Sequence, residues 1–178
     1  MAGADEFLAA FGPPRAGTAG RAAWPRALPD VDAALAITGS GLFADGLLGL
    51  ASVREVGLSL DGWPVPPAEA AVPFLSTAMG VVFARGKQVI WVIDSWEGSA
   101  FDSDMSVDEL LSQLASEDSR NGTLDWPGYK GWLERSGPLP DTSILQPKPL
   151  PILGGSGAIS SCHAAEIKVH MDIVRQLL

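Results

Sequence analysis

The chain of 178 residues has little of what cross-links small proteins or binds metals, with one cysteine and two histidines. The lone Cys162 has no partner for an internal disulfide, and unpaired thiols are usual in reducing compartments. A chain of this length buries about 70% of its unfolded surface, which is enough for a stable core without cross-links. We therefore expect a fold held together by its hydrophobic core, with no structural metal.

Basic residues and long apolar runs are also scarce. Twelve Lys and Arg stand against 21 Asp and Glu, a formal net charge of −9. Apolar residues make up 47% of the chain, but charges or prolines interrupt every run well short of a membrane span. The first six residues carry acids where a signal peptide carries bases. These features predict a soluble cytoplasmic protein that does not bind membranes.

The negative charge is concentrated in one stretch. Residues 94–125 hold nine acidic residues and a single basic one, Arg120, so this stretch has a net charge of −8. Such a field repels nucleic acid, which is bound through Lys and Arg, and it attracts basic proteins and speeds their association. The alternative interpretation is a solvated face that only aids solubility. The charge therefore excludes a nucleic-acid partner and leaves a basic protein partner open.

The N-terminal part of the chain predicts short helices and few strands. Helices are expected over residues 5–11, from Pro29 to the glycines at 39–41, and over residues 52–60, where Ser52 and Glu55 have capping-box spacing. Residues 42–50 are apolar and indicate a strand or a buried loop. Four prolines in residues 61–73 indicate a linker or surface loop. We expect a boundary there between residues 1–60 and residues 74–178, although both parts together suit one compact unit.

The remainder of the chain predicts a hairpin followed by helices. Two β-branched and aromatic runs, residues 79–84 and 88–93, flank a short loop with Gly86, and a third strand is expected over residues 96–101. Further helices are expected over residues 106–116, 127–134 and 164–176, with an extended proline-rich segment and a Gly154–Gly157 turn before the last. The separate blocks predict an α+β fold: an antiparallel sheet packed against several short helices, with a helix at the C-terminus.

No fragment of the sequence makes a convincing catalytic or metal site. Gly154-Gly-Ser-Gly-Ala158 lacks the last glycine of a nucleophile elbow, and His163 and His170, the histidines after it, both precede Asp172. His163 and His170 fall seven residues apart, but zinc needs two further nitrogen or sulfur ligands. The aspartates at 102, 104 and 108 lack the glycine and the final glutamate of a calcium loop. We expect a protein that is not an enzyme, with no catalytic residue, metal or cofactor.

Three stretches carry a resemblance to a known family. The first comprises Phe7-Leu-Ala-Ala-Phe-Gly-Pro-Pro14, Leu28-Pro29 and the segment from Gly41 to Leu47, and the second is the hairpin that ends at Asp94. The third is Pro147-Lys-Pro-Leu-Pro-Ile-Leu-Gly-Gly-Ser156, followed by the helix that contains His170. Together they resemble the immunity proteins of type VI secreted DNase effectors, which have a GAD-like N-terminal region and a C-terminal immunity domain. Ala36-Ile-Thr-Gly-Ser-Gly41 departs from the family, which usually has aromatic residues before this turn.

The resemblance implies a cognate nuclease toxin as the partner, and the charge pattern agrees with it. A DNase presents a basic groove to phosphates, and carboxylates of an inhibitor can occupy that groove. Trp96 is the first choice for an aromatic anchor and Trp126 a weaker one, with ordinary packing as the alternative for both. The predicted toxin-binding residues are Asp94, Trp96, Glu97, Asp102, Asp104, Asp108 and Glu109.

Two other functions remain open at this point. One is a general protein-interaction or regulatory domain without a toxin partner. The other is a small hydrolase that uses Ser156, whose activity would be lost in Ser156→Ala. The sequence identifies neither the nuclease family nor the oligomeric state.

Overall fold

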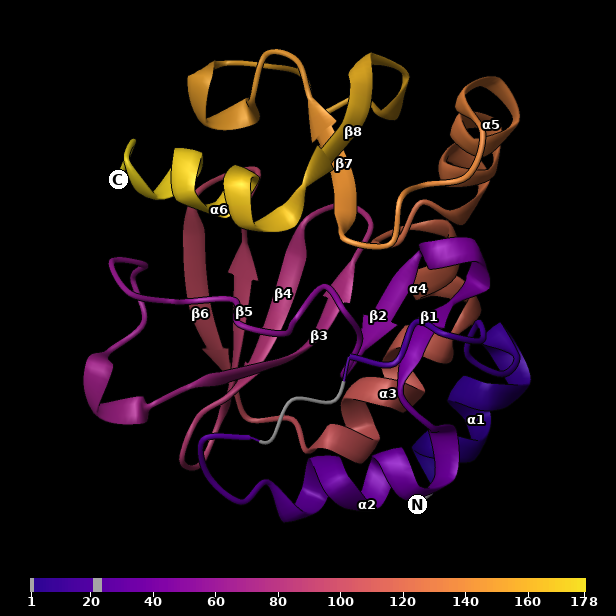
Figure 1. Ribbon diagram of the computed structural model, residues 1–178, viewed down its shortest axis with the longest axis vertical. Coiled ribbons are helices and arrows are strands. Elements are labelled where there is room, and N and C mark those ends of the chain that lie inside the picture. The colour runs from indigo at the N-terminus through magenta and orange to yellow at the C-terminus, as the bar shows by residue number, and fades with distance from the viewer. Residues whose placement is uncertain (1, 21–23) are drawn as a thin grey trace.

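Six short antiparallel strands form one sheet in which the spatial order follows the chain order (Figure 1). The computed structural model describes residues 2–20 and 24–178. The strands are β1 (Gly41–Phe43), β2 (Leu48–Leu50), β3 (Val72–Thr77), β4 (Val81–Arg85), β5 (Ile90–Asp94) and β6 (Ser99–Ser103). β2 precedes the proline-rich residues 61–73 and pairs with β3, which begins at the end of that segment. The domain boundary between residues 1–60 and residues 74–178 stays a prediction.

The alternating side chains of the central hairpin divide the core into two layers. Val82 pairs with Ile93, and both pack on one face of the sheet. Phe83 pairs with Val92, and both pack on the other face. Strand side chains alternate between faces, so an unbroken apolar run such as Val-Val-Phe-Ala places residues on both sides of a sheet. The hairpin is therefore covered on both faces.

The helices of the N-terminal and central parts lie on the face of Phe83. They are α1 (Ala2–Phe11), α2 (Pro29–Thr38), α3 (Val107–Ala115) and α5 (Trp126–Ser136), and the short α4 (Glu117–Asn121) lies between α3 and α5 in the chain and contacts both. α1 packs closely on α3, because Gly3 leaves room for the backbone of α3; a Cβ there would lie 1.9 Å from the carbonyl oxygen of Asp108. The ring of Phe7 meets Phe43 edge-on at 5.0 Å, which fixes α1 against the sheet.

The C-terminal helix covers the opposite face. α6 (Ile167–Arg175), yellow in Figure 1, buries Met171 and Val174 against Val82 and Ile93. Before it, β7 (Ser143–Pro147) and β8 (Cys162–Glu166) form a separate two-stranded sheet. Four short 3₁₀ turns complete the elements: η1 (Ala44–Gly46), η2 (Pro67–Glu69), η3 (Pro151–Leu153) and η4 (Ile159–Ser161). Within residues 2–20 and 24–178, no helix has the length and hydropathy needed to cross a bilayer.

The structure confirms the α+β class, the antiparallel sheet and the C-terminal helix. The capping box at Ser106 and Glu109 opens α3 as predicted. Residues 42–50 form the β1–β2 hairpin, and the third strand begins at Ser99, later than predicted, because residues 95–98 make the turn. The last helix also begins later, at Ile167, because residues 162–166 pair with β7.

The predicted helix over residues 52–60 is wrong. Ser52 forms an isolated bridge with Ala19 and residues 53–57 form turns, in which Gly57 has a φ angle of 68° that no right-handed α-helix contains. The predicted Ser52–Glu55 contact exists, because the Glu55 carboxylate accepts hydrogen bonds from the Ser52 N–H and hydroxyl, both at 2.6 Å. The same carboxylate also accepts from the Ser76 hydroxyl of β3. The contact therefore ties a turn to the sheet, where the sequence suggested a helix start.

Candidate functional site

The acidic stretch does not form one continuous cluster in space. Asp94 ends β5, whereas Asp102 lies in β6 opposite Trp91. Three residues of strand separate these positions, about 10 Å at the usual rise. Their side chains also leave opposite faces of the sheet, because Asp94 shares a face with Val92 and Asp102 shares a face with Trp91. The seven predicted toxin-binding residues therefore divide into two groups.

The first group lies around the turn between β5 and β6. The carboxylate Oδ1 of Asp94 accepts hydrogen bonds from the backbone N–H of Trp96 at 2.9 Å and of Glu97 at 3.2 Å. The indole N–H of Trp96 donates to the carbonyl oxygen of Leu145 in β7 at 2.9 Å, and its ring is half-buried against the core. Glu97 is exposed. Trp96 thus has a packing role, whatever its part in binding a partner.

The second group lies at the other end of the β5–β6 hairpin. Asp102 and Asp104 are exposed. The carboxylate of Asp108 accepts from the backbone N–H of Ala4 at 3.3 Å and so holds the start of α1. Glu109 accepts from the backbone N–H of Ser106 at 2.8 Å, and this bond, with that of the Ser106 hydroxyl, lowers the pKa of the carboxyl. Two of the four acids in this group therefore already stabilise helix starts.

A small pocket joins the first group to a residue that sequence reasoning did not select. Its volume is about 250 Å³, and Asp94 and Trp96 line it together with Asp125. The rest of the lining comes from Met79, Val81, Thr123, Gly157 and Ile159. Asp125 belongs to the acidic stretch and precedes Trp126-Pro127, a sequence typical of a helix start. That signal predicts its capping role but not its place beside Asp94.

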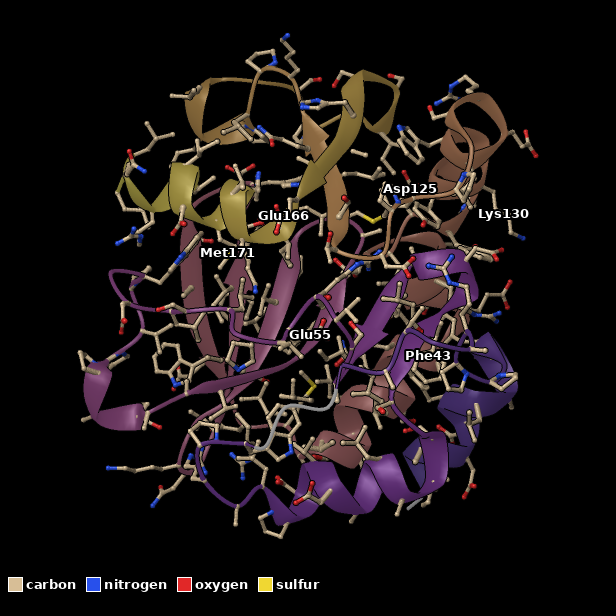
Figure 2. All side chains as sticks on the ribbon, in the orientation of Figure 1. Phe43, Glu55, Asp125, Lys130, Glu166 and Met171 are labelled. Atoms are coloured by element: carbon tan, nitrogen blue, oxygen red, sulfur yellow. The ribbon has the colours of Figure 1, made fainter. Side chains whose placement is uncertain are left out.

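Asp125 sits at the beginning of α5, where Figure 2 labels it. Its Oδ1 accepts a hydrogen bond from the backbone N–H of Gly128 at 3.0 Å, which caps the helix. Its backbone is left-handed, with φ 37° and ψ 51°, a conformation that Asp and Asn tolerate better than most residues. The cap and the turn before it direct this half-buried carboxylate into the pocket wall.

A buried histidine supports the pocket from the opposite side of the sheet. The ring Nε2 of His170 in α6 lies within hydrogen-bond distance of both oxygens of Ser95, and the Ser95 hydroxyl donates to the carbonyl oxygen of Gly80 at 2.6 Å. Burial lowers the pKa of His170 to about 4 and keeps the ring neutral. Gly80 has a φ of 75°, and a Cβ there would lie 2.4 Å from the Ser95 hydroxyl oxygen, so glycine is required at this position. These bonds connect the β3–β4 turn, the end of β5 and α6.

The structure also shows the surroundings of Ser156 and Cys162. The Gly154–Ala158 segment lies between η3 and η4, away from any strand-to-helix turn, and the Ser156 hydroxyl oxygen accepts from the backbone N–H of Ala158. Burial raises the pKa of the Cys162 thiol to about 11, which makes it a poor nucleophile at neutral pH. Over the described ranges, no three His, Cys, Asp or Glu side chains are grouped to hold a metal ion.

The chain matches a known family over part of its length and is similar to a solved structure over nearly all of it. Residues 104–178 match the family described as "T6SS immunity protein Tdi1, C-terminal". No curated protein matches the chain. The crystal structure of Atu4351 from Agrobacterium tumefaciens is similar over 97% of this chain and 88% of that chain, with a TM-score of 0.66 and 17% sequence identity. At this identity the likeness shows the fold alone.

The family match supports the class of type VI secretion immunity proteins, which act by binding a toxin protein. The matched part begins at residue 104, within the acidic stretch, and includes α3, α4, α5 and α6. The pocket lies across its border, because Asp125 belongs to the matched part whereas Asp94 and Trp96 precede it.

Proposed function

We propose that this protein is an immunity protein that binds and neutralises a cognate DNase toxin of the type VI secretion system. Its binding surface comprises the seven residues of the two groups, and it acts in the cytoplasm of the cell that makes the toxin. Residues 1–60 form the GAD-like part of the protein. The family match over residues 104–178 supports the immunity role, and the charge supports a nuclease as the partner.

The single observation that carries the nuclease assignment is the net charge of −8 over residues 94–125. A DNase needs a cationic groove to hold the phosphates of its substrate. Carboxylates such as Asp102 and Asp104 remain exposed and, within the described parts of the chain, form no ion pair, so they are available to basic side chains. An acidic inhibitor associates fast with such a groove and competes with DNA for it.

The first experiment is co-expression with the nuclease encoded in a neighbouring gene, followed by co-purification and a DNA-degradation assay. We expect a stable complex in which DNA cleavage is blocked. The association rate should fall steeply as salt rises, because exposed charges steer the encounter. If the product of the neighbouring gene forms a complex with this protein but does not cleave DNA on its own, the DNase assignment is refuted and the immunity role stands.

A charge-reversal pair tests whether the acidic surface contributes. Asp102→Lys with Asp104→Lys should lower the association rate about tenfold or more at low salt. The matched control is Asp61→Lys with Glu134→Lys, two exposed carboxylates outside the acidic stretch, which changes the net charge equally. Asp108 is left intact because it holds the start of α1. Equal effects of the two pairs would show that only net charge matters and would refute a specific acidic surface.

A further inference from the structure

The pocket between the β5–β6 turn and the start of α5 has the chemistry of a receptor for one cationic side chain. Asp94 and Asp125 line it from segments 31 positions apart in the chain, and Trp96 lines it as well. We propose that this pocket receives an arginine side chain of the toxin and so forms the central anchor of the complex. This inference rests on the proposed function and specifies how it is carried out.

Each carboxylate has one oxygen that makes no hydrogen bond to the described residues. The hydrogen bonds of Asp94 to the turn and of Asp125 to α5 all use Oδ1. The Oδ2 atoms bond to no group in residues 2–20 or 24–178, and neither carboxylate forms an ion pair there. Both side chains are half-buried. A partly desolvated carboxylate without a counter-ion gains more from an incoming cation than an exposed one does.

The one lysine of α5 contacts an aromatic ring outside the pocket lining. The ammonium group of Lys130 lies over the Trp126 ring, 4.6 Å from its centroid, and its side chain is exposed. Figure 2 labels Asp125 at the start of α5 and Lys130 further along the helix. None of the described residues that line the pocket is basic, so the cation that completes it is expected from a partner.

The shape and walls of the pocket favour arginine. A volume of about 250 Å³ is below the usual range for small-molecule sites and suits a single long side chain. Met79, Val81 and Ile159 offer apolar surface for the aliphatic stem. A planar guanidinium can stack on the Trp96 ring and donate to two carboxylates at once, which a lysine ammonium does less well. Arginine is also among the residues most enriched at the centre of tight interfaces.

A small probe tests the pocket without the toxin. Butylguanidinium is titrated into the ¹⁵N-labelled protein, and amide shifts are followed by NMR. We expect saturable shifts at residues 94–97 and 123–128, with a dissociation constant on the order of 10 mM for so small a ligand. Butylurea, a neutral analogue of the same shape, should not produce them. Absence of saturation, or equal shifts with butylurea, would overturn the arginine receptor.

The variants are chosen to remove charge and keep the fold. Asp94→Asn and Asp125→Asn retain an Oδ1 acceptor for the turn and for the helix cap, and Asn is as good a cap as Asp. The double variant should abolish the butylguanidinium shifts, whereas the control Asp61→Asn with Glu134→Gln should leave them. Shifts that persist in the double variant would place the guanidinium elsewhere. A thermal melt of each variant confirms that the fold is retained.

The toxin complex gives the second test. Asp94→Asn with Asp125→Asn should raise the dissociation constant on the order of 100-fold, mainly through faster dissociation, as loss of a buried anchor does. Asp102→Asn with Asp104→Asn removes the same charge from the rim and should act mainly on the association rate. If both pairs of substitutions lower the affinity equally and raise the dissociation rate equally, the anchor is overturned.

Failure of this inference and failure of the proposed function give different results. If the wild-type protein binds the nuclease and the pocket variant binds it equally well, the anchor is wrong and the immunity role stands. If the wild type does not bind the nuclease but butylguanidinium still saturates the pocket, the nuclease is the wrong partner and the pocket still receives guanidinium groups.

Discussion

The ring Nε2 of His170 lies 3.0 Å from the hydroxyl oxygen and 3.1 Å from the carbonyl oxygen of Ser95. A carbonyl oxygen only accepts, so Nε2 carries the proton and the other ring nitrogen, Nδ1, is unprotonated. Nδ1 has no hydrogen-bond partner among the residues that the structure describes. The neighbours of Ser95 in the chain are Asp94 and Trp96, so this contact connects α6 to the proposed arginine pocket.

The first prediction concerns acid. Burial lowers the pKa of His170 from its ordinary value of 6.5 to about 4, so between these values the unfolded chain binds a proton that the folded chain does not. Stability should therefore fall as the pH drops from 6.5 to 4, by up to about 3 kcal/mol from this group. Urea unfolding at several pH values measures it. His170→Gln should flatten this part of the profile, and His163→Gln, at an exposed position, should not. Identical profiles for His170→Gln and the wild type would contradict the assignment.

The second prediction separates packing from recognition at Trp96. Trp96→Phe keeps an aromatic ring but removes the N–H that donates to Leu145, and it should lower the free energy of unfolding by about 1–2 kcal/mol. Trp126→Phe is the control, because the indole N–H of Trp126 makes no hydrogen bond in the described parts of the chain. Calorimetry measures both. If Trp126→Phe lowers the free energy of unfolding as much as Trp96→Phe does, the hydrogen bond to Leu145 is not the cause of the loss.

The third prediction concerns the start of α3. Ser106→Ala removes both hydrogen bonds of the Ser106 hydroxyl in the capping box and should lower the free energy of unfolding by about 1 kcal/mol. Ser106→Asn retains an N-cap acceptor and should recover most of the loss. Since the pKa of Glu109 is lowered, the contribution of its carboxylate is present above the ordinary value of 4.5 and disappears as the pH falls through the lowered pKa. Chemical unfolding at neutral and acidic pH measures the effect of the two Ser106 substitutions and the pH dependence. Equal free energies of unfolding for Ser106→Ala and Ser106→Asn would contradict the capping role of Ser106.

The fourth prediction concerns Arg54, which is fully buried. Its three guanidinium nitrogens have no hydrogen-bond partner in the described residues, and desolvation lowers its pKa despite the nearby charge of Glu55. A buried charge without good partners costs stability, so Arg54→Met should raise the free energy of unfolding by about 1–3 kcal/mol. Arg15→Met removes the exposed ion pair with Asp141 and should change it by less than about 1 kcal/mol. Destabilisation by Arg54→Met would show that the guanidinium is paired in solution.

Local patterns predicted those elements whose stabilisation is local. The hairpin of β4 and β5 follows from two apolar runs around a short loop, and the capping box of α3 needs only residues three apart. The Ser52–Glu55 spacing shows the limit of this reasoning. The same two side chains do bond, but Glu55 also bonds Ser76, and the chain turns to reach it. A contact 21 positions away thus overrides a helix signal.

The sequence by itself determined the class of fold, the concentration of negative charge between residues 94 and 125, and the resemblance to immunity proteins. These depend on composition, on short-range periodicity and on motifs within single segments. Only the tertiary structure decided how the acids are grouped, because the face of a strand and the path of the next loop separate or join residues regardless of their spacing. Asp94 and Asp102, eight positions apart, leave opposite faces of the sheet, whereas Asp94 and Asp125, 31 positions apart, line one pocket.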